Sequence, residues 1–131
     1  MNELYNKNID STSFSFNDLL GVDRWLDFAP AFTSLTTVGA TSISGRFRIV
    51  GRWLQFQVRL SAATSIASTA GTTYMALPIV AEGYAGMAVM TDDTAKTSVG
   101  NCHIDVTNSR CYLPTQSASG HVFTLCGNYE I

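Results

Sequence analysis

Few residues in this chain have types and spacings that could carry chemistry. His103 and Asp105 are two positions apart in an alternating segment, so they are expected on one face of a strand. That face is opposite Ile104 and Val106 and should be exposed. A histidine and a carboxylate at this spacing could relay a proton or help to bind a metal, although a polar surface pair is the simpler interpretation. His121 has no carboxylate near it in the sequence and is expected on the surface or at a strand edge.

The other catalytic patterns that a sequence can reveal are absent. Asp92 and Asp93, followed by Thr94, predict a turn, because aspartate side chains bond to their own backbone at turn starts. A calcium loop would need more oxygen ligands at regular spacing. Neither G-x-S-x-G nor a phosphate-binding glycine loop occurs. We therefore predict a protein with no catalytic residue, no bound metal and no cofactor.

The cysteines are odd in number, and no two of them form a C-x-x-C motif. Cys102, Cys111 and Cys126 each lie among strand-forming residues, where a cysteine acts as a small buried hydrophobe. Reduced thiols and synthesis in a reducing cytoplasm fit this pattern best. A bridge from Cys102 to either of the other two stays open, because spacing alone does not choose between pairings.

Four arginines form a local basic cluster: Arg46, Arg48, Arg52 and Arg59. The formal net charge of the whole chain is −2, which argues against a nucleic-acid partner, since that would need a basic patch or stripe. Arginine is enriched at protein interfaces. We therefore expect an interaction face for an acidic neighbour, with a carbohydrate or nucleic-acid site as the alternative.

The elements that must position these side chains are clearest between residues 44 and 60. Two segments alternate between apolar and polar residues on either side of Gly51, which indicates a hairpin of half-buried strands. Gly51 lies where a tight turn needs a residue without a Cβ atom. The side chains predicted to enter the core are Phe47, Ile49, Leu54, Phe56, Val58 and Leu60.

The rest of the chain continues this β pattern. At 131 residues it is expected to form one domain, residues 25–131, behind an N-terminal arm, residues 1–24. Short apolar segments separated by Gly, Ser, Asn or Pro are typical of an antiparallel β-sandwich. The predicted strands cover residues 31–37, 42–50, 53–61, 72–77, 84–91, 99–107, 109–113 and 121–130. The Ser-, Ala- and Thr-rich residues 61–73 are expected to be a long loop.

The first 24 residues differ in composition from the remainder. They are rich in Asn, Ser and Asp, and Asn17 could cap one short helical turn. We expect an extended arm that becomes ordered against another surface; a frayed terminus is the alternative. Its predicted anchors to a capsid or to another subunit are Tyr5, Phe14, Phe16, Leu19 and Leu20.

The surface should be partly covered by other chains. Charged residues make up 14% of the sequence, against roughly 25% in ordinary soluble domains, so a homo-oligomer is expected. The first ten residues lack the apolar stretch of a secretory signal. Residues 74–90 are the least polar segment, but Pro78 and Glu82 interrupt them and they are too short to span a membrane.

Three segments together resemble a β-domain that recurs in virion proteins of tailed bacteriophages. They are Trp25 followed by Phe28-Ala29-Pro30, residues 45–52 (GRFRIVGR) and residues 121–129 (HVFTLCGNY), with Leu77-Pro78 as a strand end between them. Phe47 stands where the family commonly has Tyr, and Trp53-Leu54 stands where a Thr-Val pair is frequent. Neither difference alters the alternation.

The resemblance implies a jelly-roll-like sandwich, often trimeric, that serves as a virion accessory. Because the chain opens with Met and has only a short leader, we expect a capsid decoration or cement protein. It would be made in the host cytoplasm and would bind the major capsid protein or another virion protein on the capsid surface. The alternative is a tail- or head-fibre tip that binds a host-surface glycan. A cellular carbohydrate-binding module is a third interpretation, but the expected cluster of exposed aromatics is not seen in the sequence.

Overall fold

A computed structural model describes residues 24–62, 64–83 and 85–131, without the side chains of residues 118 and 119. This part of the chain contains strands and no helix. The strands are β1 (Leu26–Phe28), β2 (Phe32–Thr33), β3 (Thr36–Val38), β4 (Thr41–Val50), β5 (Trp53–Ala62), β6 (Ser65–Ser68), β7 (Tyr74–Ala76), β8 (Gly86–Asp92), β9 (Thr97–Asp105), β10 (Arg110–Tyr112), β11 (Gln116–Ser119) and β12 (Val122–Glu130). No helix in the described ranges is long and apolar enough to cross a membrane.

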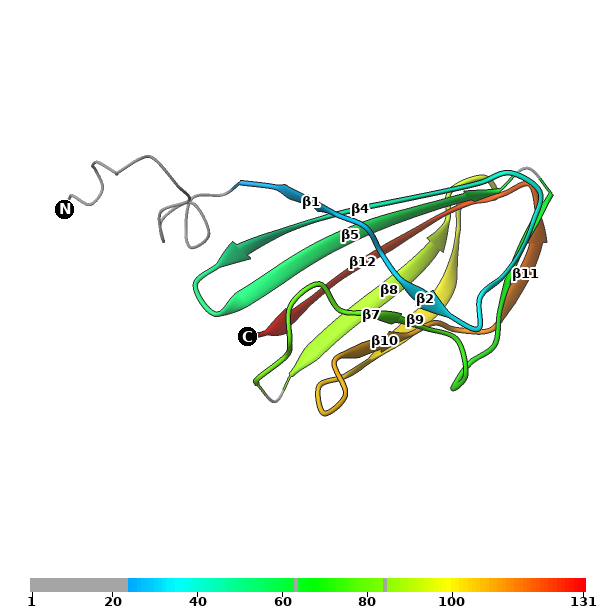
Figure 1. Cartoon of the computed structure of the whole chain (residues 1–131). Coiled ribbons are helices and arrows are strands. Elements are labelled where there is room, and N and C mark those ends of the chain that lie inside the picture. The colour runs from blue at the N-terminus through cyan, green and yellow to red at the C-terminus, as the bar shows by residue number, and fades with distance from the viewer. Residues whose placement is uncertain (1–23, 63, 84) are drawn as a thin grey trace.

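One antiparallel ladder contains nine of these strands. Their order is β1-β4-β5-β12-β8-β9-β10-β7-β2, and a separate three-stranded sheet has the order β11-β6-β3 (Figure 1). The two edge strands of the ladder, β1 and β2, are joined by only residues 29–31. Four residue steps span at most about 14 Å, so the ladder must curl back on itself. The result is a half-barrel, or sandwich, with two facing layers.

The core lies between these layers. Along β5 every second side chain is buried, including Phe56 at 1% exposure, while its neighbours Gln55 and Gln57 are only half-buried. The ring of Tyr129 packs near Phe56, with centroids 6.2 Å apart. Its hydroxyl donates to the Ile79 carbonyl at 2.7 Å and accepts from the Ile79 amide at 3.1 Å. Tyr129 therefore ties β12 to the segment that follows β7.

The predicted β4–β5 hairpin is confirmed. The two strands pair from Thr41 and Ala62 to Val50 and Trp53, and Gly51 takes a φ of 64° in the turn. Positive φ at the first of two turn positions is typical of type II′ hairpins, which favour glycine there. Of the predicted core residues, only Phe47 differs.

Phe47 is half-buried rather than fully enclosed, because it lies one strand from the sheet edge. It packs edge-on against Phe28 of β1, with ring centroids 5.8 Å apart. The neighbouring Gly45 makes room for β1: a Cβ atom there would lie 2.7 Å from the rings of both Phe28 and Pro30. The Trp25 and Gly45 segments of the phage resemblance are thus packed against each other.

Two predictions about strand positions are wrong. The predicted strand 31–37 is divided into β2 and β3, with Ser34 between them at a φ of 62°. The predicted loop 61–73 contains β6, which pairs with both β3 and β11. Small polar residues hid the alternation of β6, because its buried positions are Ile66 and Ser68. Ser68 is buried because its hydroxyl donates to the Pro114 carbonyl at 2.6 Å.

The predicted all-β, antiparallel, jelly-roll-like sandwich is confirmed in this curled form. The predicted arm lies outside the described residues apart from Arg24, and so do its proposed anchors Tyr5, Phe14, Phe16, Leu19 and Leu20.

Candidate functional site

The outward surface of β1, β4, β5, β12 and β8 gathers three of the four predicted arginines. Strand register places Arg46 between Asp27 and Gln57, and Arg48 opposite Gln55. These side chains face outward because the residues that alternate with them fill the core. We name this surface the arginine face; its members are Trp25, Asp27, Ser44, Arg46, Arg48, Gln55, Gln57, Arg59, Met87, Val89, Thr124 and Cys126.

Arg46 and Arg48 are held in place by neighbours on both sides. The Nε and Nη2 atoms of Arg46 donate to Gln57 Oε1 at 3.0 and 2.8 Å, and Arg48 Nε donates to Gln55 Oε1 at 2.7 Å. Both guanidinium groups also lie over the Trp25 ring, 4.6 and 4.9 Å from its centroid. Cation–π contacts of this kind add attraction to the hydrogen bonds. Less side-chain freedom is then lost when a partner binds.

The two remaining arginines differ in position. Arg59 pairs across the strands with Ser44 and Thr124 and is exposed, and its side chain makes no hydrogen bond to the described part of the chain. Its guanidinium is therefore available to an external acceptor. Arg52 lies in the β4–β5 turn, away from the other three.

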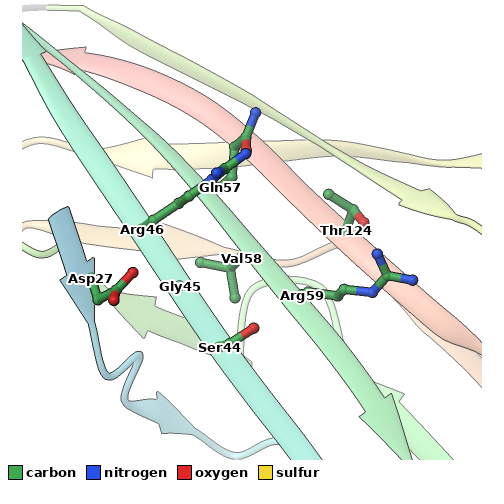
Figure 2. Close-up of a pocket in the computed structure, with 8 residues that line it drawn as sticks. All are labelled: Asp27, Ser44, Gly45, Arg46, Gln57, Val58, Arg59 and Thr124. Carbon is green, nitrogen blue, oxygen red and sulfur yellow. The ribbon is translucent and has the colours of Figure 1, made fainter. Parts of the chain in front are cut away.

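An open groove of about 280 Å³ lies between Arg46 and Arg59. Figure 2 shows Arg46 turned toward Gln57, whereas Arg59 extends from β5 beside Thr124. The carboxylate of Asp27 comes from β1 on the other side of β4. The full lining is Asp27, Ser44, Gly45, Arg46, Gln57, Val58, Arg59 and Thr124. This groove can accept hydrogen-bonding and anionic groups.

A second open groove, of about 340 Å³, continues the first across β12 to β8. Gln57 lines both grooves, and Trp25, Cys126 and Met87 are among the residues that line the second. Met87 is 69% exposed and Val89 is 44% exposed. Arginine, tryptophan and methionine are all enriched at protein–protein interfaces. The arginine face thus combines a polar groove with an apolar border.

The side chains of this face offer cations, hydrogen-bonding groups and apolar contacts. Asp27 is the one carboxylate in its grooves, and no histidine lines either of them. No group of three or more His, Cys, Asp or Glu side chains that could hold a metal occurs within the described ranges. The sequence did not predict that Trp25 lies beside the arginines. Its position follows only from the pairing of β1 with β4, the strand that carries Arg46 and Arg48.

A carboxylate–imidazole pair lies elsewhere, at the end of β8. His121 Nδ1 is 2.7 Å from Asp92 Oδ2. Asp92 Oδ1 accepts hydrogen bonds from the backbone amides of Thr94 and Ala95, which confirms the predicted turn. The Ala95 amide, then His121, lowers the pKa of Asp92 below its ordinary value. His121 has no carboxylate near it in the sequence, as expected, but the fold brings it to Asp92, which is 29 residues away along the chain.

In the described part of the chain, no hydroxyl or thiol hydrogen-bonds the other ring nitrogen of His121. Its visible role is to close the β8–β9 turn onto the start of β12. His103 and Asp105 do share a face, but Asp105 Oδ1 accepts from the Thr107 and Asn108 amides instead of contacting His103.

The three cysteines are free thiols. Cys102 and Cys111 are buried on neighbouring strands. The hydrogen bond between the two thiols and then burial raise the pKa of Cys111. Cys126 is half-buried in the second groove, and burial is the main cause that raises its pKa. It is the only one of the three that is not fully buried.

Comparisons with known proteins found no match for this chain. No protein-family model matches the chain, no curated protein matches it, and no solved structure matches it.

Proposed function

We propose that this chain is a non-enzymatic virion structural protein of a tailed bacteriophage. Its simplest role is that of a capsid decoration or cement protein, which binds the outside of the head and stabilises it. The sequence resemblance motivates this role, and the packing of its Trp25 segment against its Gly45 segment supports it. The observation that carries the proposal is the arginine face, a pre-organised binding surface without a visible catalytic group.

The arginine face is the surface that docks onto the partner. Arg59 offers an exposed guanidinium, and Arg46 and Arg48 are already oriented by glutamines and Trp25. An acidic patch on the major capsid protein, or on another virion protein, would complement these three cations. Met87 and Val89 would supply the apolar contact that charged groups alone do not provide.

Two further features belong to the proposal. The low charged fraction of 14% and the exposed Val50 and Trp53 at the β4–β5 turn favour a homo-oligomer, and the resemblance favours a trimer. The N-terminal arm would act as a second anchor to the shell. Deleting residues 2–22 should leave the sandwich folded and reduce attachment to capsids that lack the native protein; unchanged occupancy would remove the arm from the proposal.

A pair of charge reversals tests the docking face. Arg59→Glu reverses a charge on the arginine face without breaking a hydrogen bond, and Arg52→Glu makes the same change in the turn away from it. We expect Arg59→Glu to weaken attachment to bare capsids by about tenfold or more, since like charges across an interface cost several kcal/mol. Arg52→Glu should have a much smaller effect. Equal effects of the two variants, or none, would contradict docking through this face.

Cys126 provides an independent measurement. Its half-buried thiol lines the second groove, so bound partner should slow its alkylation by a maleimide. Peptide mass spectrometry before and after capsid binding would measure this protection, with denatured protein as the control for full reactivity. Alkylation at the same rate in the bound state would place the interface elsewhere.

A further inference from the structure

The opposite layer of the sandwich carries a second outward cluster, made of two half-buried tyrosine rings and the exposed ring of His103. Strand register aligns Tyr112 of β10 with Tyr74 of β7 on one side and with His103 of β9 on the other. The alternating residues Met75 and Cys111 are fully buried, so the three rings point outward. We name this surface the tyrosine face; its members are Tyr74, Ala76, His103, Asp105, Arg110 and Tyr112.

The rings form one row across three strands. The centroids of Tyr74 and Tyr112 are 5.3 Å apart, and those of Tyr112 and His103 are 6.3 Å apart. Neighbouring strands are about 4.8 Å apart, so the row extends over roughly 10 Å. This length corresponds to one or two pyranose rings laid side by side.

Arg110 is fixed at the border of this row. Its guanidinium lies over the Tyr74 ring, 4.2 Å from the centroid, and its Nη1 atom donates to the Tyr112 hydroxyl at 3.2 Å. A guanidinium has five N–H donors, and no second acceptor for Arg110 is found among the described residues. Ala76, opposite Arg110 in the register, is exposed and carries only a methyl group.

The tyrosine face differs from the arginine face in having no large exposed apolar side chain. The large exposed apolar side chains of the described chain lie elsewhere: Val38, Ile43, Val50, Trp53, Val80, Met87 and Val89. The tyrosine face offers aromatic ring faces bordered by fixed donors. An aromatic ring carries negative charge on its face, which attracts polarised C–H groups, and the donors suit hydroxyl oxygens. A pyranose has both kinds of group, with C–H bonds on one side and hydroxyls around its edge.

We propose that the tyrosine face is a saccharide-binding site. The pyranose ring lies on Tyr112, and Arg110, which covers the Tyr74 ring, binds its hydroxyl or carboxylate oxygens together with His103. The site uses no residue of the arginine face and does not depend on capsid attachment. Strands distant in the sequence bring these rings together; Tyr74 and Tyr112 are half-buried and His103 is exposed.

Saturation-transfer NMR on the intact protein tests the proposal. The probes are the methyl pyranosides of glucose, galactose and N-acetylglucosamine as neutral sugars, and those of glucuronic acid and sialic acid as carboxylated sugars, each at millimolar concentration. We expect transfer to at least one probe, accompanied by chemical-shift changes at residues 74, 103, 110 and 112. The group of sugars that responds, neutral or carboxylated, identifies whether Arg110 binds a hydroxyl or a carboxylate.

Variants separate stacking from a general effect on the fold. Tyr112→Leu and Tyr74→Leu should each reduce transfer at least about fivefold, in line with the stabilisation that aromatic contacts provide. Trp53→Leu is the matched control, because it removes an exposed aromatic from the β4–β5 turn and should leave transfer unchanged. Arg110→Gln should weaken binding while retaining the rings. Unchanged spectra of core residues would establish that each variant is folded.

Two results would overturn the proposal. One is that no sugar, neutral or carboxylated, shows any saturation transfer. The other is transfer that persists in both folded tyrosine variants or that is lost equally in Trp53→Leu. Charge reversal at Arg59 should not affect sugar binding, so failure here and failure of the docking proposal are distinguishable.

Discussion

The two outward faces of this sandwich use the same residue type in different settings. On the arginine face, guanidinium groups are paired with glutamines across the strands and bordered by exposed Met87 and Val89. On the tyrosine face, a single guanidinium is held among three aromatic rings. The first setting suits a large protein partner and the second suits a small polyhydroxyl ligand. The two proposed binding surfaces would share a core but no side chain.

The difference between the two faces follows from which residues are paired across neighbouring strands. A side chain on a sheet surface is positioned mainly by its cross-strand neighbours. Gln57 opposite Arg46 keeps the cation flat against the sheet. Tyr74 and Tyr112, paired with each other, create a ring surface on which Arg110 can stack. The identity of the paired residue thus decides what an arginine can bind.

The largest expected effect comes from the core that supports both faces. Phe56→Ala should lower the free energy of unfolding by about 3–5 kcal/mol, because the ring is fully buried and its removal leaves a cavity. Chemical denaturation would measure the loss. Phe47→Ala, at a half-buried position in the next strand, should cost clearly less. Similar losses for the two variants would mean that the layers do not share one core around Phe56.

A second variant should damage the arginine face alone. Gly45→Ala places a Cβ atom against the rings of Phe28 and Pro30, and overpacking of this kind costs about 1–3 kcal/mol. β1 should shift, and Trp25 fluorescence should report the change. Gly51→Asn is the control, since nothing lies within 4 Å of a Cβ atom there and Asn tolerates positive φ. Altered NMR shifts at Tyr74 and Tyr112 in Gly45→Ala would show that the faces are not independent.

A third variant tests the link between the two layers. Tyr129→Phe removes the hydroxyl that bonds both backbone groups of Ile79. Buried polar groups left without a partner cost about 1–3 kcal/mol, so the melting temperature should fall. Hydrogen exchange should accelerate at the Ile79 amide first. Unchanged exchange there would mean that the hydroxyl does not hold this segment.

The smallest expected effects concern pH. The pKa of Asp92 is lowered by the Ala95 amide and His121, and the pKa of Asp105 is lowered mainly by the Asn108 side chain. A lowered folded pKa contributes stability above the ordinary pKa of aspartate, and this is lost as the pH falls through the folded value. Asp92→Asn and Asp105→Asn should therefore each be less stable than wild type near neutrality, and the difference should shrink in acid. Melting curves across the acid range would measure it; a difference that grows in acid would reverse the sign.

The alternation of apolar and polar residues was sufficient to predict β4 and β5, which carry the arginines of the arginine face. In the adjoining parts of β4 and β5, residues 46–49 and 54–60, large apolar residues alternate with long polar ones, so the hairpin, its turn and most of its core residues could be predicted. The outward arginines followed from the same alternation. Trp25 could not be assigned to them, because β1 has only three residues and its pairing with β4 is a long-range contact.

The remaining features depend on contacts that a local pattern does not contain. β6 and β11 consist largely of small polar residues, so burial and exposure leave little trace in their sequences. The Tyr74–Tyr112 and Asp92–His121 pairs join segments that are distant along the chain. Strand order decides such pairs, and the order β12-β8-β9-β10-β7 cannot be read from periodicity.

The most direct test of the proposed function is a reconstruction of the phage particle in which we propose that this chain resides. We predict copies on the order of hundreds on the head, with Arg46, Arg48 and Arg59 in contact with the shell and the tyrosine face exposed to solvent. A few dozen copies or fewer, located at a tail or fibre, or a tyrosine face buried against the shell, would contradict docking through the arginine face.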